Sequence, residues 1–338
     1  MLEKPAAKNE FSDSRLSSIR RGAQQGGFDA WRLLSAPFST VVKLHSARLQ
    51  SHGGIDAFVI GSLGLVSGHC GAHLVRRTQD QVSATPGFIL ITYYHGGRVT
   101  GMMDGDPFGA QKGDLILRDL DYGFEALRYP STFQSILIPR RLLGIEHGKL
   151  QRLRILQSDD LIHRAVIAVM QDVFDALKMN ATALSDDLMQ RLLATVRKGL
   201  LHPGAGLSRR QSVRQRQMRA IEHCIERNLG RLDLSAETIL PEFGLSRATL
   251  YRLFESKGGV RRYIVDRRLF RALMEISDSS TRRGKIQFAA KRWGFSSPSN
   301  FNRSVQQMFG ASPGALLKEP ANHDLDIKGF KQTASVNV

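Results

Sequence analysis

The chain has few cysteines for its length, and this scarcity excludes several classes of protein. Only Cys70 and Cys224 occur among the 338 residues. Two distant thiols cannot build a disulfide framework, a four-thiolate zinc site or the cysteine cluster that a DNA-repair methyl acceptor needs. They are typical of a protein from a reducing compartment. A chain of this length can instead bury two hydrophobic cores, one in each of two domains.

Sequence motifs for metal binding and nucleophilic catalysis are also missing. None of the ten histidines is followed two residues later by Asp or Glu, a spacing common in mononuclear iron sites. His69 and His73 are four residues apart, but they lie in a Gly-rich, strand-like segment rather than on a helix. Neither a nucleophile elbow nor a phosphate-binding glycine loop is present. We therefore expect no catalytic residues, no metal and no cofactor, and a protein that is not an enzyme.

Long apolar runs are lacking as well. The first thirty residues mix charged residues, Ser and Gly, and the uncharged run at residues 57–75 is interrupted by glycines. This pattern predicts no secretory signal and no membrane segment, and we expect a cytoplasmic protein.

Positive charge, by contrast, is abundant and unevenly distributed. Residues 206–338 carry 24 Lys and Arg against 12 Asp and Glu, a net charge of +12, whereas residues 1–205 carry 24 against 19, a net charge of +5. The excess in the last part favours a polyanionic partner such as nucleic acid. A merely solvated basic surface is the alternative that charge alone leaves open.

The two halves of the chain differ in hydrophobic periodicity. From residue 38 to residue 140, short apolar runs such as "GFILITYY" and "GDLILRD" alternate with turn formers, which predicts an antiparallel β unit. Residues 159–178 and 185–201 have helical periodicity and are expected to cover the open face of the β unit or to pair with a second chain. The apolar face predicted for the first helix consists of Leu161, Ala165, Ala168, Val169, Asp172 and Val173. Residues 202–217 are expected to form a Gly-, Ser- and Arg-rich connector.

The remainder of the chain is predicted to be helical and contains a repeat. Aligning "TLYRLFESKGGV" with "NFNRSVQQMFGA" at an offset of 51 residues matches Arg252 to Arg303 and Gly259 to Gly310. In the second copy, Gly294 is suited to end one helix, while Ser297 and Pro298 are suited to begin the next. Phe301, Val305 and Met308 would face inward, which leaves outside Ser299, Asn300, Asn302, Arg303 and Gln306.

This arrangement is that of a helix-turn-helix unit, whose second helix enters the major groove of DNA. Asn can pair with adenine, and Arg can read guanine or bind a phosphate. In the first copy, Ser246 would cap the reading helix, and the side chains left for DNA are Arg247, Ala248, Tyr251 and Arg252. An ordinary antiparallel helix pair is the alternative reading of one copy, and two copies in the most basic part of the chain argue against it.

Residues 260–276 lie between the two copies and contain neither Gly nor Pro. This segment is therefore predicted to form one helix of roughly 25 Å. Such a helix could hold the reading helices about 34 Å apart, which is one turn of DNA. The arginines and lysines expected to face phosphates are Arg261, Arg262, Arg267, Arg268, Arg271, Arg282, Arg283, Lys285, Lys291 and Arg292.

Over residues 215–318 the sequence resembles the double helix-turn-helix domain of AraC/XylS-type transcription regulators. The resemblance rests on "RWGF" at residues 292–295, "FNR" at 301–303, "FG" at 309–310 and "SP" at 312–313. In that family, the positions that match Ala248, Tyr251, Arg252, Ser299, Asn300 and Arg303 face base edges or adjacent phosphates. Two departures stand out: Pro241 lies inside the first expected helix, where it would shorten or kink it, and Val305 replaces a usual aromatic residue.

The β half is similar to the cupin-like sensor domains that precede this DNA-binding domain in many family members. The resemblance implies an α+β chain with an N-terminal arm (1–35), a cupin-like sensor or dimerisation barrel with flanking helices (36–201), a linker (202–214), an all-α double helix-turn-helix domain (215–318) and a disordered tail (319–338). It further implies a transcription activator with double-stranded DNA and RNA polymerase as partners, a small-molecule effector and a homodimer. A cupin-type metalloenzyme with a basic localisation domain is the alternative function.

Overall fold

The computed structural model describes residue 32 and residues 35–45, 54–158, 160–179, 184–201, 209–278 and 284–317. For residues 209–212 it describes only the backbone. Most of the expected N-terminal arm, the expected tail at 319–338, Asp159, Arg282 and Arg283 therefore lie outside the described residues.

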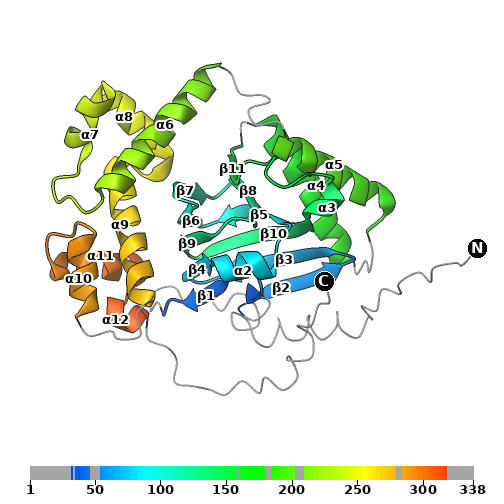
Figure 1. The fold of residues 1–338 in the computed structure, drawn as a ribbon, viewed down its shortest axis with the longest axis horizontal. Coiled ribbons are helices and arrows are strands. Elements are labelled where there is room, and N and C mark those ends of the chain that lie inside the picture. Colours follow the sequence, from blue (N-terminus) through cyan, green and yellow to red (C-terminus); the bar gives the residue numbers. More distant parts are fainter. Residues whose placement is uncertain are drawn as a thin grey trace, which may run out of the picture.

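Two antiparallel sheets form the N-terminal half (Figure 1). The five-stranded sheet has the order β1 (Thr40–Lys43), β4 (His73–Arg77), β9 (Phe124–Arg128), β6 (Arg98–Met103) and β7 (Asp106–Gln111). The six-stranded sheet has the order β11 (Leu153–Leu156), β8 (Leu115–Asp119), β5 (Phe88–Gly96), β10 (Ser131–Pro139), β3 (Leu63–Cys70) and β2 (Ile55–Ile60). The predicted antiparallel, cupin-like β unit is confirmed, and so is the α+β fold class.

Strand β8 shows how the six-stranded sheet is buried on both faces. Successive side chains of a strand point to opposite faces. Leu115 and Leu117 belong to the core beneath the helices, whereas Ile116 belongs to the core between the two sheets. All five residues of β8 are therefore buried, including Arg118 and Asp119.

Helices α4 (Leu161–Lys178) and α5 (Asp186–Leu201) cover the outer face of the six-stranded sheet, one of the two arrangements that the sequence left open. Asp160 caps α4 by accepting a hydrogen bond from the Ile162 backbone N–H at 2.8 Å. The predicted apolar face of α4 is wrong in part: Val169 and Val173 are buried, but Leu161 is 64% exposed and Ala165, Ala168 and Asp172 are exposed. Because "LIHRAVIAVM" is apolar on most sides, the bulkier residues Ile162, Val166, Met170, Phe174 and Leu177 take the inner face instead.

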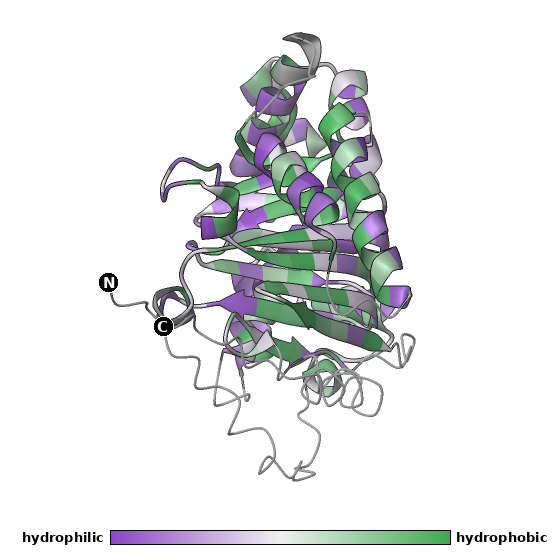
Figure 2. Ribbon diagram, turned by 90° about the vertical axis from the view of Figure 1, so that its right-hand side faces the viewer, coloured by the Kyte–Doolittle hydropathy of each residue, from purple (hydrophilic) through white to green (hydrophobic). Residues whose placement is uncertain are grey.

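The connector expected at residues 202–217 is shorter than predicted, because helix α6 begins at Arg209. The C-terminal half then consists of α6 (Arg209–Asn228), α7 (Ala236–Phe243), α8 (Arg247–Phe254), the 3-10 turn η1 (Glu255–Lys257), α9 (Val260–Ser277), α10 (Lys285–Arg292), α11 (Pro298–Phe309) and α12 (Pro313–Leu316). Two further short helices, α2 (Gln79–Ala84) and α3 (Arg140–Leu143), belong to the β unit. Figure 2 shows hydrophobic and hydrophilic residues alternating around the helices, while the strands are largely hydrophobic.

Helix α9 is the continuous helix predicted between the two copies, and it also joins the halves of the molecule. It lies between the other C-terminal helices and the five-stranded sheet (Figure 1). One hydrophobic core contains Leu74, Met102 and Leu127 of that sheet together with Phe270 and Leu273 of α9. The DNA-binding helices and the β unit are therefore packed as one body along α9.

Candidate DNA-binding surface and the domain interface

The first helix-turn-helix unit consists of α7 and α8. Gly244 ends α7 in the left-handed conformation, with φ of 60°, and Ser246 begins α8 by accepting a hydrogen bond from the Thr249 backbone N–H at 3.2 Å. Pro241 does not shorten α7: the helix spans eight residues, as does α10, its counterpart in the second unit. The turn is therefore formed as the sequence predicts, and the shortening considered for Pro241 does not occur.

Helix α8 separates core and surface as predicted. Leu250, Leu253 and Phe254 are buried in the core of the first unit. The four side chains predicted to face DNA are all exposed in the full chain: Arg247, Ala248, Tyr251 and Arg252. Arg247 forms an ion pair with Glu237 of α7.

The second unit, α10 and α11, repeats this construction. Gly294 has φ of 74° and follows α10, and Ser297 accepts a hydrogen bond from the Asn300 backbone N–H at 3.2 Å, with Pro298 at the first helical position. A Cβ at Gly294 would overlap the Leu229 carbonyl oxygen, so the turn also packs tightly against the end of α6. Only glycine fits both requirements.

Helix α11 likewise has a buried and an exposed face. Phe301, Val305 and Phe309 are fully buried, and the ring of Phe295 packs on that of Phe301 at 5.0 Å between centroids. The exposed face carries Ser299, Asn300, Asn302, Arg303 and Gln306. Among the described residues, no carboxylate pairs with Arg303, so its guanidinium is available to a ligand.

Three of the arginines expected to face phosphates are structural instead. Arg267 is 0% exposed, donates to Glu226 Oε2 at 2.8 Å and reaches into the β unit to Thr100 Oγ1 at 2.8 Å and the Gly101 carbonyl at 2.7 Å. Arg271 donates to the same Glu226. Arg268 donates to the Leu229 and Arg231 carbonyls. Helical spacing alone could not show that this side of α9 meets a sheet rather than solvent.

Glu226 is the acceptor at the centre of this network. Burial alone would raise its pKa, but Arg267 and Arg271 outweigh that effect and hold the pKa below its usual range. The carboxylate therefore stays charged and compensates two guanidinium groups at the junction of α6, α9 and β6.

Basic residues on α6 were missed by the sequence reasoning, which assigned them to the connector or to no role. Arg214, Arg216 and Arg219 are exposed on this helix, and Arg214 Nη2 donates to the Arg252 carbonyl of α8 at 3.0 Å. The signal that could have found them is "RRQSVRQRQMR", which lacks Gly and Pro and has helix-forming residues throughout.

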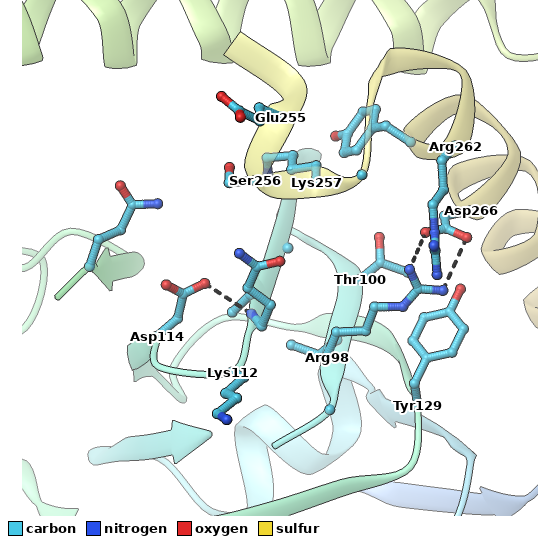
Figure 3. Close-up of a pocket in the computed structure, with 18 residues that line it drawn as sticks. Arg98, Thr100, Lys112, Asp114, Tyr129, Glu255, Ser256, Lys257, Arg262 and Asp266 are labelled. Atoms are coloured by element: carbon cyan, nitrogen blue, oxygen red, sulfur yellow. Dashed lines mark hydrogen bonds and ion pairs between the residues drawn. The ribbon is translucent and has the colours of Figure 1, made fainter. Parts of the chain in front are cut away.

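A polar cleft of about 630 Å³ lies between the β unit and the start of α9 (Figure 3). Arg98 lines this cleft, pairs with Asp266 at 2.8 Å and stacks on Tyr129 at 3.9 Å. Burial raises the pKa of Asp266, although Arg98 opposes the shift. Lys112 and Asp114 lie at the β-unit side, and Asp114 accepts from the Gln111 backbone N–H at 2.9 Å. Within the cleft, the charges of Arg98 and Asp266 thus compensate each other.

The histidines weighed as metal ligands lie on consecutive strands of different sheets, His69 on β3 and His73 on β4. His69 Nδ1 is 3.0 Å from Thr132 Oγ1, and His73 Nδ1 is 2.8 Å from the Gly71 carbonyl. Burial, with the nearby Arg128, lowers the pKa of His73 to about 3, so its ring is neutral. Across the described ranges, no group of three or more His, Cys, Asp or Glu side chains is arranged to hold a metal ion. None of the helices in those ranges is long and apolar enough to cross a membrane.

Comparison with known proteins agrees with this geometry. Residues 240–319 match the family model described as a helix-turn-helix domain. The transcriptional activator NphR of Rhodococcus sp is 23% identical over 262 residues, which cover 74% of this chain and 76% of NphR.

Two solved structures are also similar. The AraC-like transcriptional activator CuxR is 22% identical with a TM-score of 0.45, over 74% of this chain and 93% of CuxR. ToxT from Vibrio cholerae O395 is 15% identical with a TM-score of 0.30, over 69% of this chain and 89% of ToxT.

The domain match falls on the segment in which the structure shows two successive helix-turn-helix units joined by one long helix. Residues 240–319 therefore belong to a helix-turn-helix domain, and the chain is similar to a transcriptional activator over three quarters of its length.

Proposed function

We propose that the chain activates transcription by placing α8 and α11 in two consecutive major-groove segments of one duplex. One observation carries this proposal. Each of the two helices buries its apolar face in a core and exposes its polar face to solvent, although the β unit is present. Short polar side chains near a helix start allow close approach to base edges. Asn300 is suited to adenine, and Arg303 to guanine or a phosphate.

The spacing of the two units supports this docking. Helix α9 has 18 residues, which corresponds to about 27 Å. Because successive major-groove segments on one face are about 34 Å apart, a helix of this length is suited to join two reading helices. The two units expose different side chains, so a single chain prefers an asymmetric site.

Phosphate contacts come from the basic side chains that remain exposed. They are Arg214, Arg216 and Arg219 of α6, Arg261 and Arg262 of α9, and Lys291 and Arg292 of α10. Each contact releases condensed counterions, so the affinity for DNA falls steeply as salt rises.

The remaining expectations belong to the same proposal. The β unit with its helices, residues 36–201, senses a small effector or mediates homodimerisation, and residues 215–318 bind DNA and present the chain to RNA polymerase in the cytoplasm. NphR and CuxR, whose names describe them as activators, support activation rather than repression. Sedimentation of the purified full chain tests the dimer.

The test of DNA reading uses the full chain and duplexes selected from genomic fragments. We expect tighter binding to selected duplexes than to random ones at physiological salt, because base contacts add to phosphate contacts. Equal affinity for both would refute sequence-specific reading.

Substitution of one reading residue sharpens this test. Arg303→Ala should cost about 1–3 kcal/mol on the selected duplex and relax the preference at one base step. Arg164→Ala, on the exposed side of α4, removes the same charge far from the reading helices and should leave binding unchanged. If Arg303→Ala weakens binding equally on all duplexes, Arg303 contacts a phosphate instead.

We also propose that the β unit performs sensing and not catalysis. The metalloenzyme alternative requires a transition metal held by residues 1–200. Metal analysis of the purified full chain decides between them: a stoichiometric transition metal would favour the enzyme.

A further inference from the structure

A second cavity lies inside the β unit, between the two sheets, and it differs in character from the polar cleft. Its volume is about 250 Å³. The walls are mainly apolar and aromatic side chains, among them Phe58, Leu65, Val99, Phe124, Phe133 and Leu137. Among the residues that the structure describes, no Asp or Glu lines it. Such a cavity is suited to a small apolar molecule.

Arg118 is the exception in this apolar setting. It projects from β8, is 2% exposed, and its guanidinium lies 5.4 Å from the ring centres of both Phe108 and Phe124. Its Nε is buried without a hydrogen-bond partner, the Tyr94 hydroxyl interacts with the guanidinium, and no described carboxylate forms an ion pair with it. Burial, above all, lowers the pKa of Arg118, but a guanidinium remains charged in proteins.

Other buried arginines of the chain show what Arg118 lacks. Arg267 pairs with Glu226, Arg140 pairs with Asp119, and Arg154 pairs with Asp160 at 3.6 Å. Arg77 donates to backbone carbonyls, including that of Leu120 at 2.7 Å. A buried charge without such a partner is costly. The cost is removed when an anion enters the cavity.

A second cation lines the same cavity from the opposite sheet. Arg128 projects from β9, 4.6 Å from the ring centre of Phe133. Arg118 on one wall and Arg128 on the other thus each bring a cationic side chain to the low-dielectric interior. A neutral sugar would find few hydrogen-bonding groups here, since Ser135 is one of few polar residues besides the two arginines.

We propose that this cavity binds a small apolar monocarboxylate, with its carboxylate on the Arg118 guanidinium and its hydrocarbon part against the aromatic walls. The guanidinium fork matches a carboxylate with two parallel hydrogen bonds. The volume restricts the hydrocarbon part to one ring or a short chain. This inference rests on the proposed function, because it names the class of effector that the β unit senses.

The cavity is placed to influence the DNA-binding helices. Its wall in the five-stranded sheet includes Val99 of β6 and Ala126 of β9, whose side chains point inward. The neighbouring residues Thr100 and Leu127 point to the opposite face of the same sheet, where α9 packs and Arg267 bonds to Thr100. The ligand and the helix that joins the reading helices thus share one sheet between them.

Calorimetric titration of the full chain tests the proposal without any DNA. The probes are 3-phenylpropanoate and hexanoate, each compared with its own amide, which has the same shape but no charge. We expect each acid to bind the wild type about tenfold more tightly than its amide or better, because only the acid neutralises Arg118. Arg118→Met should abolish this preference.

Two controls make the result decisive. Arg152→Met removes an arginine whose side chain is 48% exposed and which pairs with Asp104 on the surface, so the preference for acids should persist. Ligand-free Arg118→Met should melt at or above the wild-type temperature, since the substitution removes an uncompensated buried charge.

Three outcomes would overturn the proposal. They are equal or no binding of acids and amides by the wild type, an acid preference that survives Arg118→Met, or a lower melting temperature of ligand-free Arg118→Met. Each of these leaves the DNA-binding measurements untouched, so this inference can fail while the proposed function stands.

Discussion

The two helix-turn-helix units have the same construction, but they pack into different hydrophobic cores. The first unit has its own core, which includes Ile239, Leu250 and Phe254. The second unit packs Phe301 and Phe309 into a core that continues into the five-stranded sheet. Two reading helices of similar design are thus anchored in different hydrophobic cores.

Further contacts attach the second unit to the β unit. The rings of Tyr129 and Phe309 stack at 5.8 Å, the His45 backbone N–H donates to the Leu316 carbonyl at 2.8 Å, and Arg76 pairs with Asp278 at the end of α9. A change in the β unit therefore reaches α11 through packed side chains, while it reaches α8 mainly through α6 and α9. Two helices of similar design can therefore respond differently to one change in the β unit.

The largest expected effect comes from removing the buried link between the halves. Arg267→Ala should lower the free energy of unfolding by about 3–5 kcal/mol, because buried Glu226 is left with Arg271 alone and the bonds of Arg267 to the β unit are lost. Arg261→Ala, on the exposed side of the same helix, should stay within about 0.5 kcal/mol of the wild type. Urea denaturation measures both. Similar values for the two variants would show that Arg267 is dispensable to the interface.

The same network gives a pH dependence with a defined sign. The folded-state pKa of Glu226 is lower than its usual value. Its contribution to stability is therefore complete above the unfolded pKa, about 4.3, and is lost as pH falls through the folded pKa. Urea denaturation of the wild type and Glu226→Gln at a series of pH values should show their stabilities converging in acid. A difference that grows as pH falls would contradict this assignment.

Truncating a core side chain in each unit tests whether the two units are held by different cores. Phe301→Ala and Leu250→Ala should each cost about 2–5 kcal/mol, because both side chains are 0% exposed. Hydrogen exchange should then differ. Phe301→Ala should weaken protection in β6 and β9 as well as in α11, whereas Leu250→Ala should weaken it in α7 and α8. Identical exchange patterns would mean that the two units share one anchor.

The sequence predicted the helix-turn-helix units in detail because their signals are local. Ser246, Ser297 and Gly294 act within one turn of chain, and their caps and conformations were correctly placed. The exposed faces of α8 and α11 followed from the same local periodicity. Their contacts with DNA remain a prediction.

What the sequence could not predict depends on contacts between distant segments. The role of Arg267 is set by Thr100, 167 residues away, and the inner face of α4 is set by the sheet it covers. The lack of a described carboxylate beside Arg118 is likewise a property of the cavity that surrounds it. In each case the sequence shows the residue, but only the packing of a second element decides its function.

The glycine in the turn of each unit allows a further comparison, with smaller expected effects on stability. Gly244 and Gly294 both have positive φ, but nothing lies within 4 Å of a Cβ at Gly244, whereas one at Gly294 would overlap the Leu229 carbonyl oxygen. Gly244→Ala should therefore cost only the strain of the left-handed conformation, about 1 kcal/mol. Gly294→Ala should cost more, about 2–4 kcal/mol, because the backbone of α6 must also move. Equal costs by urea denaturation would show that the second turn is as loosely packed as the first.

The smallest expected effect concerns the serine caps of the reading helices. Ser246→Ala and Ser297→Ala should each destabilise the chain by about 1 kcal/mol, since each hydroxyl accepts a backbone N–H at 3.2 Å. The two substitutions should nevertheless differ in their effect on the affinity of the chain for DNA.

Helix α11 packs in a core shared with the five-stranded sheet, so Ser297→Ala should leave the position of α11 and the affinity for DNA nearly unchanged. Helix α8 depends on its own small core, so Ser246→Ala should loosen it and weaken DNA binding further. Equal losses of DNA affinity would argue that anchoring to the β unit does not order the second reading helix.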